Sequence, residues 1–450
     1  MADQSIIRIT KEIGELQKSS DLSLAVAFRD RDVRSVKALI IGPHETPYEF
    51  GFFEFSVKFN RDYPRKSPSV TGTTTNGGRC RFNPNIYASG KVCLSILSTW
   101  RGERGEEWSA AQGLESILLS IQSLMSSNPY ENEPGFEDAN EIHDKKNQKE
   151  YIAKIRHETL RISVIQRLEE YLGLSGGCLP TASSAEQEEY GMEADDDIDI
   201  DDASVPWEPF KDLCKRRFLW YYDSYLESIA KAKEEVKDGQ PFARMPFEGA
   251  SNSMDGKFNY TELEKRIKRI KAALDAEAEK WASDWASPKM KDATVAVNLT
   301  RQFEQIKESF KRSDVPHSVE LVNGNPFVWN LTYFGRPMTN LDGGMFRIKF
   351  NFSPRFPEEQ PRIKFLTPVF HHRIAADGTP CYFPNSSRRE DIKQHIEAII
   401  EALEEEQPPY DPRTLVHPEA HKLYWGTPEQ RKLYNRQLRR SVQRSMEDFL

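Results

Sequence analysis

The spacing of apolar residues changes along the first third of the chain. Ile6, Ile9, Ile13 and Leu16 recur at the three- and four-residue intervals of one helix face, which predicts an amphipathic helix over residues 5–18. Runs rich in β-branched and aromatic residues follow, separated by turn-forming Gly and Pro, and they predict strands at 23–28, 35–41, 52–59 and 69–74. Helical spacing then returns and predicts helices at 110–125 and 151–172. Together these elements predict one α+β domain over residues 1–172.

The composition changes after this domain. Residues 173–205 are small and acidic, with the run Asp-Asp-Asp-Ile-Asp-Ile-Asp-Asp at 195–202. A segment with few apolar residues and clustered like charges cannot bury a core, so we predict an acidic flexible linker here. Its acidic run is either solvated chain or a docking element for a basic surface. The helical segment 206–290 follows, with helices expected at 211–236 and 260–285 that can pair as a hairpin.

From about residue 291 the plan of the first domain begins again, roughly 290 residues later. The pattern predicts a helix at 295–311, strands at 318–322, 327–333, 345–352 and 362–365, and helices at 391–403 and 428–448. We therefore expect a second, divergent domain over residues 291–450. The predicted fold class is α+β, with two similar domains joined by the acidic linker and the helical segment.

Composition and charge narrow the classes of partner. No apolar run approaches the roughly 20 residues that span a bilayer, and the chain start has neither a basic region nor an apolar signal core. We therefore expect an intracellular protein of the cytoplasm or the nucleus, without membrane contact. The net charge of −8 gives no overall basic field for nucleic acid, so protein partners are favoured.

Neither the cysteines nor the histidines form a recognisable metal motif. The cysteines at positions 80, 93, 178, 214 and 381 show no paired short spacing, which indicates reduced thiols rather than a disulfide framework or a zinc site. Common ligand types also occur at His371, His372, Cys381, His417 and His421. A zincin motif requires Glu after its first His, and Pro418 stands there instead. We predict no metal and interpret these histidines as surface residues.

The most informative stretch is residues 81–97, in which Asn83-Pro84-Asn85 precedes Cys93. It resembles the catalytic core of ubiquitin-conjugating enzymes, whose signature is a His-Pro-Asn triplet eight residues ahead of the active cysteine. Asn85 stands eight residues before Cys93. The segments 42–53 and 63–68 resemble the strand-turn signature and proline-rich loop of that family, and Trp108-Ser109 resembles its downstream motif. Four motifs in the correct order make the resemblance specific.

Further segments narrow the resemblance to the Z-type branch of the family. Those segments are 83–85, 91–97, 128–137, 155–159 and 221–223. The likeness covers about residues 5–285, so the helical middle is assigned to the same branch. Asn83 replaces the usual histidine, as in the Z type. Arg65 stands where many members have an aromatic or aliphatic residue, which leaves ligase preference open.

The resemblance implies a thioester on Cys93. The chain would accept ubiquitin or a ubiquitin-like protein from a ubiquitin-activating enzyme and pass it to a substrate lysine, usually with a ubiquitin ligase. It needs no cofactor because ATP is spent upstream. Such transfer requires an exposed thiol. Asn85 either stabilises the oxyanion that develops on the thioester carbonyl or only holds the loop in shape.

The resemblance also assigns supporting residues. The gating position of the family, usually acidic, falls within Tyr130-Glu131-Asn132. Partner-binding residues are expected on the first helix, in the proline loop and around the active-site loop. They are Arg8, Lys11, Pro64, Arg65, Lys66, Trp100 and Trp108.

The second domain keeps the spacing of the motif but changes its chemistry. Cys381 follows Arg373 by eight residues, but His372-Arg373 replaces Pro-Asn. One interpretation is a second catalytic site, in which Arg373 stabilises an oxyanion or a Cys381 thiolate and Asp411 takes the gating position. The alternative is a non-catalytic ubiquitin-binding scaffold. For the first domain, the pairing of Cys93 with Asn85 disfavours the scaffold; for the second, the scaffold is the leading interpretation.

Overall fold

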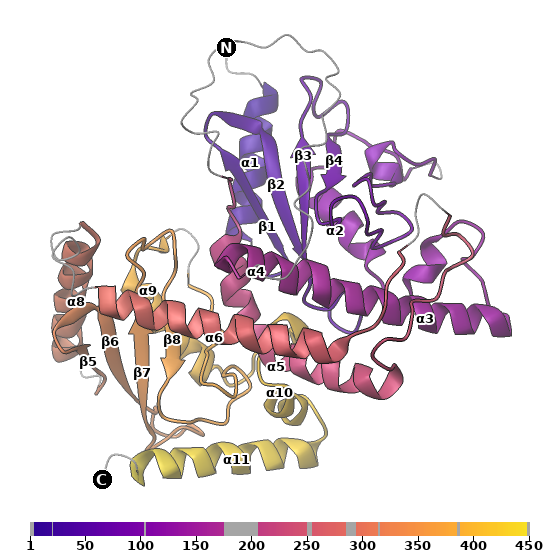
Figure 1. The fold of residues 1–450 in the computed structure, drawn as a ribbon. Helices are drawn as coiled ribbons and strands as arrows, with labels where there is room; N and C mark the ends of the chain where they lie inside the picture. Colours follow the sequence, from indigo (N-terminus) through magenta and orange to yellow (C-terminus); the bar gives the residue numbers. More distant parts are fainter. Residues whose placement is uncertain are drawn as a thin grey trace.

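Two antiparallel sheets organise the chain (Figure 1). The computed structural model describes residues 4–19, 21–102, 105–174, 206–249, 254–284, 294–313, 316–384 and 388–447. We call 4–174 the N-terminal region, 206–284 the helical segment and 294–447 the C-terminal region. The predicted linker lies outside the described residues from position 175 to 205, as does Cys178.

The sheet of the N-terminal region has the strand order β1-β2-β3-β4. Its strands are β1 (Leu24–Arg29), β2 (Asp32–Ile41), β3 (Phe52–Lys58) and β4 (Ser69–Gly72). Helices α1 (Gln4–Lys18) and α2 (Leu114–Leu124) share an apolar core with one face of the sheet. Ile9 and Ile13 of α1 are buried in that core, as helical periodicity predicts, whereas Ile6 is partly exposed.

The opposite face of this sheet is also covered. Leu39 and Ile41 of β2 belong to a second core, while Ala38 and Ile40 belong to the first. A continuous helical rod covers this face, formed by α3 (Ile142–Glu158), the π-helical turns η3 (Thr159–Gln166) and α4 (Arg167–Leu172). Because successive strand residues point to opposite faces, an unbroken apolar run such as 38–41 indicates burial on both sides.

Two predicted helices have different starts in the structure. The helix expected at 151–172 begins at Ile142, where Glu141 and Asp144 form a reciprocal capping box. Its first turns are polar and Ile142 itself is 92% exposed, so they carry no apolar periodicity. The helix expected at 110–125 begins only at Leu114 and ends at Leu124.

The C-terminal region repeats this plan with the strand order β5-β6-β7-β8. Its strands are β5 (Ser318–Val322), β6 (Asn325–Phe334), β7 (Met345–Asn351) and β8 (Arg362–Phe365), and its helices are α8 (Thr294–Arg312), α9 (Ile392–Glu404), α10 (Pro418–Tyr424) and α11 (Pro428–Glu447). The short α10 was not predicted. The repeat includes the same tight turn in both regions. A Cβ added to Gly42 would lie 1.7 Å from a backbone carbonyl oxygen, and a Cβ added to Gly335 would lie 1.8 Å from one. These observations confirm the predicted repeat.

The helical segment lies between the two sheets (Figure 1). Helices α5 (Lys211–Glu235) and α6 (Tyr260–Asp284) pair in antiparallel fashion, and α6 packs against β6 and β7. On α5, the ring of Tyr221 stacks on Phe50 of the N-terminal region at 3.9 Å between centroids. The Tyr221 hydroxyl donates to the carbonyl of Arg413 in the C-terminal region at 2.8 Å. The predicted hairpin is therefore confirmed, and it joins both regions.

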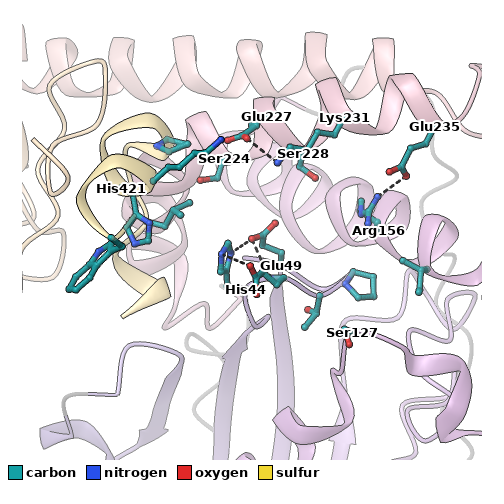
Figure 2. A pocket seen from close by; sticks show the side chains of 18 of the residues that line it. His44, Glu49, Ser127, Arg156, Ser224, Glu227, Ser228, Lys231, Glu235 and His421 are labelled. Carbon is teal, nitrogen blue, oxygen red and sulfur yellow. Dashed lines mark hydrogen bonds and ion pairs between the residues drawn. The ribbon is translucent and has the colours of Figure 1, made fainter. Parts of the chain in front are cut away.

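A polar cavity of about 860 Å³ opens where the N-terminal region, α5 and α10 meet (Figure 2). Its charges are largely paired within the protein, as between Arg156 and Glu235 at 3.1 Å. Burial lowers the pKa of His44, but the hydrogen bond to Glu49 and the charges of Glu49 and Glu45 together raise it above its ordinary value. Burial lowers the pKa of His421 to about 4. Neither Cys93 nor Cys381 lines this cavity.

Candidate active site

The loop from Asn83 to Cys93 folds back against strand β4. Ile86 and Val92 form an isolated bridge, and the amide of Gly72 donates to the carbonyl of Gly90 at 2.7 Å. Gly90 has a φ of 87°, and a Cβ there would lie 2.3 Å from the carbonyl oxygen of Gly72. Only glycine fits this close, left-handed turn. The turn brings Cys93 back beside the start of the loop.

Asn83 anchors the start of the loop from inside the core. Its side chain is fully buried, and its Nδ2 donates to the Tyr48 hydroxyl at 3.0 Å and to the Leu124 carbonyl at 2.8 Å. Its Oδ1 accepts the backbone N–H of Asn85 at 2.9 Å. The asparagine that replaces the usual histidine thus fixes the position of Asn85.

Two hydrogen bonds join Asn85 and Cys93. The amide of Cys93 donates to the Asn85 carbonyl at 2.8 Å, and Nδ2 of Asn85 donates to the Cys93 carbonyl at 3.1 Å. One side-chain hydrogen therefore holds the loop in shape. A primary amide has a second hydrogen, which stays available for an oxyanion. Both roles considered for Asn85 are compatible with this geometry.

The thiol of Cys93 is buried, although an exposed thiol was predicted. Cys93 is 4% exposed, and its neighbours Val92 and Ile96 belong to the apolar core. The Tyr87 hydroxyl lies in hydrogen-bonding contact with Cys93; burial and this contact raise the pKa of Tyr87. Access to the sulfur therefore requires movement of a side chain or of the surrounding loop.

Sequence reasoning missed three residues beside the cysteine. The guanidinium of Arg81 lies 4.5 Å from the Tyr87 ring centroid and 3.0 Å from Oε2 of Glu133. Arg81 also donates to the Pro84 carbonyl. Arg81 is 6% exposed, and a buried charge needs such partners. In the sequence, these residues are marked only by position: Arg81 stands just before the Asn-Pro-Asn triplet, and Glu133 stands just after the predicted gating residues.

The predicted gating residues lie in different environments. Tyr130 is fully buried and packs edge-on against Phe136, so its side chain is part of the core. Nδ2 of Asn132 donates to the Leu124 carbonyl at 2.8 Å, and Glu131 is exposed. The acidic side chain that forms an ion pair with Arg81 is that of Glu133.

Several predicted partner-binding residues gather on one surface. The Arg8 guanidinium lies 5.7 Å from the Tyr63 ring centroid and donates to the Ala110 carbonyl at 2.6 Å. Nε1 of Trp108 donates to the Pro64 carbonyl at 2.8 Å. The first helix, the proline loop and the segment before α2 thus meet. The remaining residues are Lys11, Arg65, Lys66 and Trp100, and all are exposed.

The loop from Arg373 to Cys381 in the C-terminal region repeats the backbone arrangement of the first loop, but its cysteine is fully buried. The amide of Cys381 donates to the Arg373 carbonyl at 2.8 Å, as Cys93 does to Asn85. Cys381 is fully buried and shares a core with Tyr221 of α5. Burial raises the pKa of Cys381, and the opposing effects of Arg373 and Arg217 are smaller, so burial disfavours a thiolate here. Asp411 binds Arg413 at 2.8 Å.

The histidines of the C-terminal region are buried rather than on the surface as expected. His371, His372 and His421 are at most 5% exposed, and burial lowers the pKa of each. In the part of the chain that the structure describes, no group of three or more His, Cys, Asp or Glu is arranged to hold a metal ion. No described helix is long and apolar enough to cross a membrane.

A family model described as "Ubiquitin-conjugating enzyme" matches residues 8–159 and again 299–438. Proteins named ubiquitin-conjugating enzyme E2 Z are among the similar ones. The Xenopus tropicalis protein is 47% identical over 168 residues, which are 37% of this chain and 52% of that protein. The Danio rerio protein is 37% identical over 273 residues, 61% and 70% of the two chains. The human protein is 40% identical over 224 residues, 50% and 52%.

The chain thus spans about half the length of the frog and human relatives. A solved Toxoplasma gondii ubiquitin-conjugating E2 domain covers 35% of this chain and 97% of its own at 25% identity, with a TM-score of 0.28 that is too low to add weight. The two family matches coincide with the two sheet-containing regions. The chain therefore belongs to the ubiquitin-conjugating enzyme family, a family of transferases, and contains two regions of that family in tandem.

Proposed function

We propose that the N-terminal region carries ubiquitin, or a ubiquitin-like protein, as a thioester on Cys93. The observation that carries this proposal is the doubly hydrogen-bonded pair of Asn85 and Cys93, inside the first family match. In the first step the Cys93 thiolate attacks the thioester carbonyl on an activating enzyme. The new C–S bond forms on Cys93, the C–S bond to the activating enzyme breaks, and the cysteine of that enzyme leaves as a thiolate.

In the second step a substrate lysine attacks the thioester on Cys93. An amide bond forms, the C–S bond breaks, and the amine loses a proton as the Cys93 thiol is released. Negative charge develops on the carbonyl oxygen, and the second Nδ2 hydrogen of Asn85, which the bond to the Cys93 carbonyl does not use, would stabilise it. Tyr87 and Glu133, linked by Arg81, surround the approach of the amine. A ubiquitin ligase would bind the surface of Arg8, Lys11, Pro64, Arg65, Lys66, Trp100 and Trp108.

For the C-terminal region we favour the non-catalytic scaffold. Cys381 has no exposed surface, and α5 packs against it. A thioester on that sulfur would have to displace the helix. We also propose the units 1–172, 173–205, 206–290 and 291–450 as catalytic domain, acidic linker, helical segment and second domain.

A charging assay tests both statements. The full chain is incubated with an activating enzyme, ATP and labelled ubiquitin, and adducts are resolved on non-reducing gels. We expect a DTT-sensitive adduct in the wild type, in Cys381→Ser and in the control Cys214→Ser, but not in Cys93→Ala. Cys214 is a buried cysteine of α5 and serves as the matched control. An adduct that persists in Cys93→Ala and vanishes in Cys381→Ser would overturn the assignment.

A further inference from the structure

Two buried arginines of the C-terminal half have guanidinium nitrogens without partners. Arg217 on α5 is 7% exposed and Arg373 is 8% exposed. Nε and Nη1 of Arg217 and Nε of Arg373 have no hydrogen-bond partner, and no ion pair joins either residue to a described carboxylate. A buried charge of this kind is costly unless an opposite charge reaches it. The two side chains therefore indicate a site for an anionic group.

Aromatic rings hold the two guanidinium groups in place. Arg217 stacks on Trp220 at 4.1 Å, and Arg373 stacks on Phe383 at 4.7 Å. The rings of Trp220 and Phe383 pack in a T-shaped arrangement with 5.6 Å between their centroids. Because the guanidinium planes are fixed, their free N–H groups are preorganised for the planar oxygens of a carboxylate.

Both arginines line a cleft of about 910 Å³ between the N-terminal and C-terminal regions. We call it the Arg217–Arg373 cleft. Leu24 and Ala25 of β1 also line it, and β1 is an edge strand of the first sheet whose Val26 carbonyl accepts from Nε2 of Gln17 at 3.4 Å. An edge strand presents backbone N–H and C=O groups that an extended peptide can pair with. The cleft thus combines a wall for a peptide backbone with two anchors for carboxylates.

The other charges of the cleft restrict where those carboxylates can lie. Asp21 and Asp411 both bind Arg413, which compensates one of their two negative charges. The α9 side of the cleft carries further carboxylates, Glu397, Glu401 and Glu405. A ligand that is acidic along its whole length would be repelled there. The acidic residues must therefore be grouped at the end that reaches the arginines.

We propose that the Arg217–Arg373 cleft binds an extended peptide of a partner protein, with acidic residues at one end that bind the two arginines. Its backbone runs along β1. This site is independent of the chemistry proposed for Cys93, because it needs no thioester. It gives the C-terminal region a binding role instead of a second reaction.

Fluorescence anisotropy on the full chain tests the proposal. The probe is a fluorescein-labelled peptide of Val, Thr and Ser that ends in three Glu, and the control peptide ends in three Gln. We expect saturable binding of the Glu peptide and at least tenfold weaker binding of the Gln peptide. Equal affinity for the two peptides would overturn the proposal. This comparison uses the unmodified protein and does not depend on the folding of a variant.

Variants then locate the site. We expect Arg217→Gln and Arg373→Gln each to weaken binding of the Glu peptide about tenfold, and Arg439→Gln, an exposed control on α11, to leave it unchanged. Cys93→Ala should bind like the wild type. Equal weakening by Arg439→Gln would place the site elsewhere. If binding appears only after the aspartates of 195–202 are changed to Asn, this chain's own acidic run is the occupant and the proposal of a partner peptide fails.

Discussion

The side-chain amide of Asn85 donates to the backbone carbonyl oxygen of Cys93 at 3.1 Å, so this side chain ties the start of the loop to the residue proposed to carry the thioester. Shape and catalysis can be separated by measuring the two half-reactions independently. A loop that only lost its shape would charge and discharge poorly. A site that lost its oxyanion donor would charge at nearly the normal rate and discharge slowly.

We expect Asn85→Ala to slow single-turnover discharge to free lysine by about 10²- to 10³-fold, the usual cost of one lost oxyanion donor. Charging by the activating enzyme should fall far less. Asn140→Ala, which removes an exposed asparagine that bonds only its own loop, is the control. If discharge keeps its normal rate while the melting temperature falls, Asn85 has only a structural role.

Tyr87 should control access to the thiol. Since its hydroxyl contacts a cysteine that is 4% exposed, we expect Tyr87→Ala to speed alkylation of Cys93 by iodoacetamide several-fold. Mass spectrometry of the Cys93 peptide over time measures this rate. Tyr410→Ala removes a tyrosine that is 57% exposed and serves as the control. An unchanged rate in Tyr87→Ala would show that another group covers the sulfur.

A buried ion pair between the N-terminal region and the helical segment should contribute strongly to the stability of the protein. Nζ of Lys154 lies 2.6 Å from Oε1 of Glu248, and both side chains are at most 4% exposed. Lys154→Met leaves the carboxylate buried without its partner, which typically costs about 3–5 kcal/mol of unfolding free energy. The exposed pair of Lys231 and Glu227 provides a matched control, and Lys231→Met should cost less than about 1 kcal/mol.

Urea unfolding measures both variants of this series. The double variant Lys154→Met with Glu248→Leu should recover part of the loss, because no buried charge then remains. A cost for Lys154→Met as small as that for Lys231→Met would contradict the burial of the pair.

The C-terminal region should lose stability in mild acid. Burial lowers the pKa of His395 to about 4, and its ring contacts the Tyr382 hydroxyl at 2.9 Å and the Arg389 carbonyl at 3.2 Å. The neutral ring can accept from one and donate to the other. The unfolded chain binds a proton near pH 6.5, so acid favours the unfolded state between about pH 6.5 and 4, by up to about 1.4 kcal/mol per pH unit.

Urea midpoints measured across this pH range test the effect. His395→Gln should show a shallower loss than the wild type, while the exposed control His143→Gln should match the wild type. Parallel curves for all three proteins would mean that His395 does not carry the pH dependence.

Apolar periodicity was sufficient to predict both sheets. Strand β5 (Ser318–Val322) has its predicted bounds, and β3 (Phe52–Lys58) differs by one residue, because runs of β-branched and aromatic residues between turn-forming residues mark a strand in the sequence. The first turns of α3 were missed because a capping box, rather than an apolar face, starts that helix. α10 was missed because it is only one to two turns long.

The chemistry of the site was only partly predictable. The sequence paired Asn85 with Cys93 by their spacing, and in the structure two hydrogen bonds join these residues. The contact of Arg81 with Glu133 joins segments 52 residues apart, and nothing local marks it. The burial of Cys381 depends on α5, which precedes it by more than a hundred residues. Apolar periodicity predicts this helix but not the surface against which it packs. Long-range contacts of this kind need the folded chain.

Because α5 and α6 form a wall shared by both sheets, the order of synthesis matters. A ribosome completes β1 to β4 well before it reaches the hairpin. During that interval part of the apolar face around Leu39 and Ile41 is open to water, since the rings of Phe218 and Tyr221 that complete its cover have not yet been made. A nascent chain that stalls before residue 211 therefore exposes an aggregation-prone apolar surface that is buried in the finished protein.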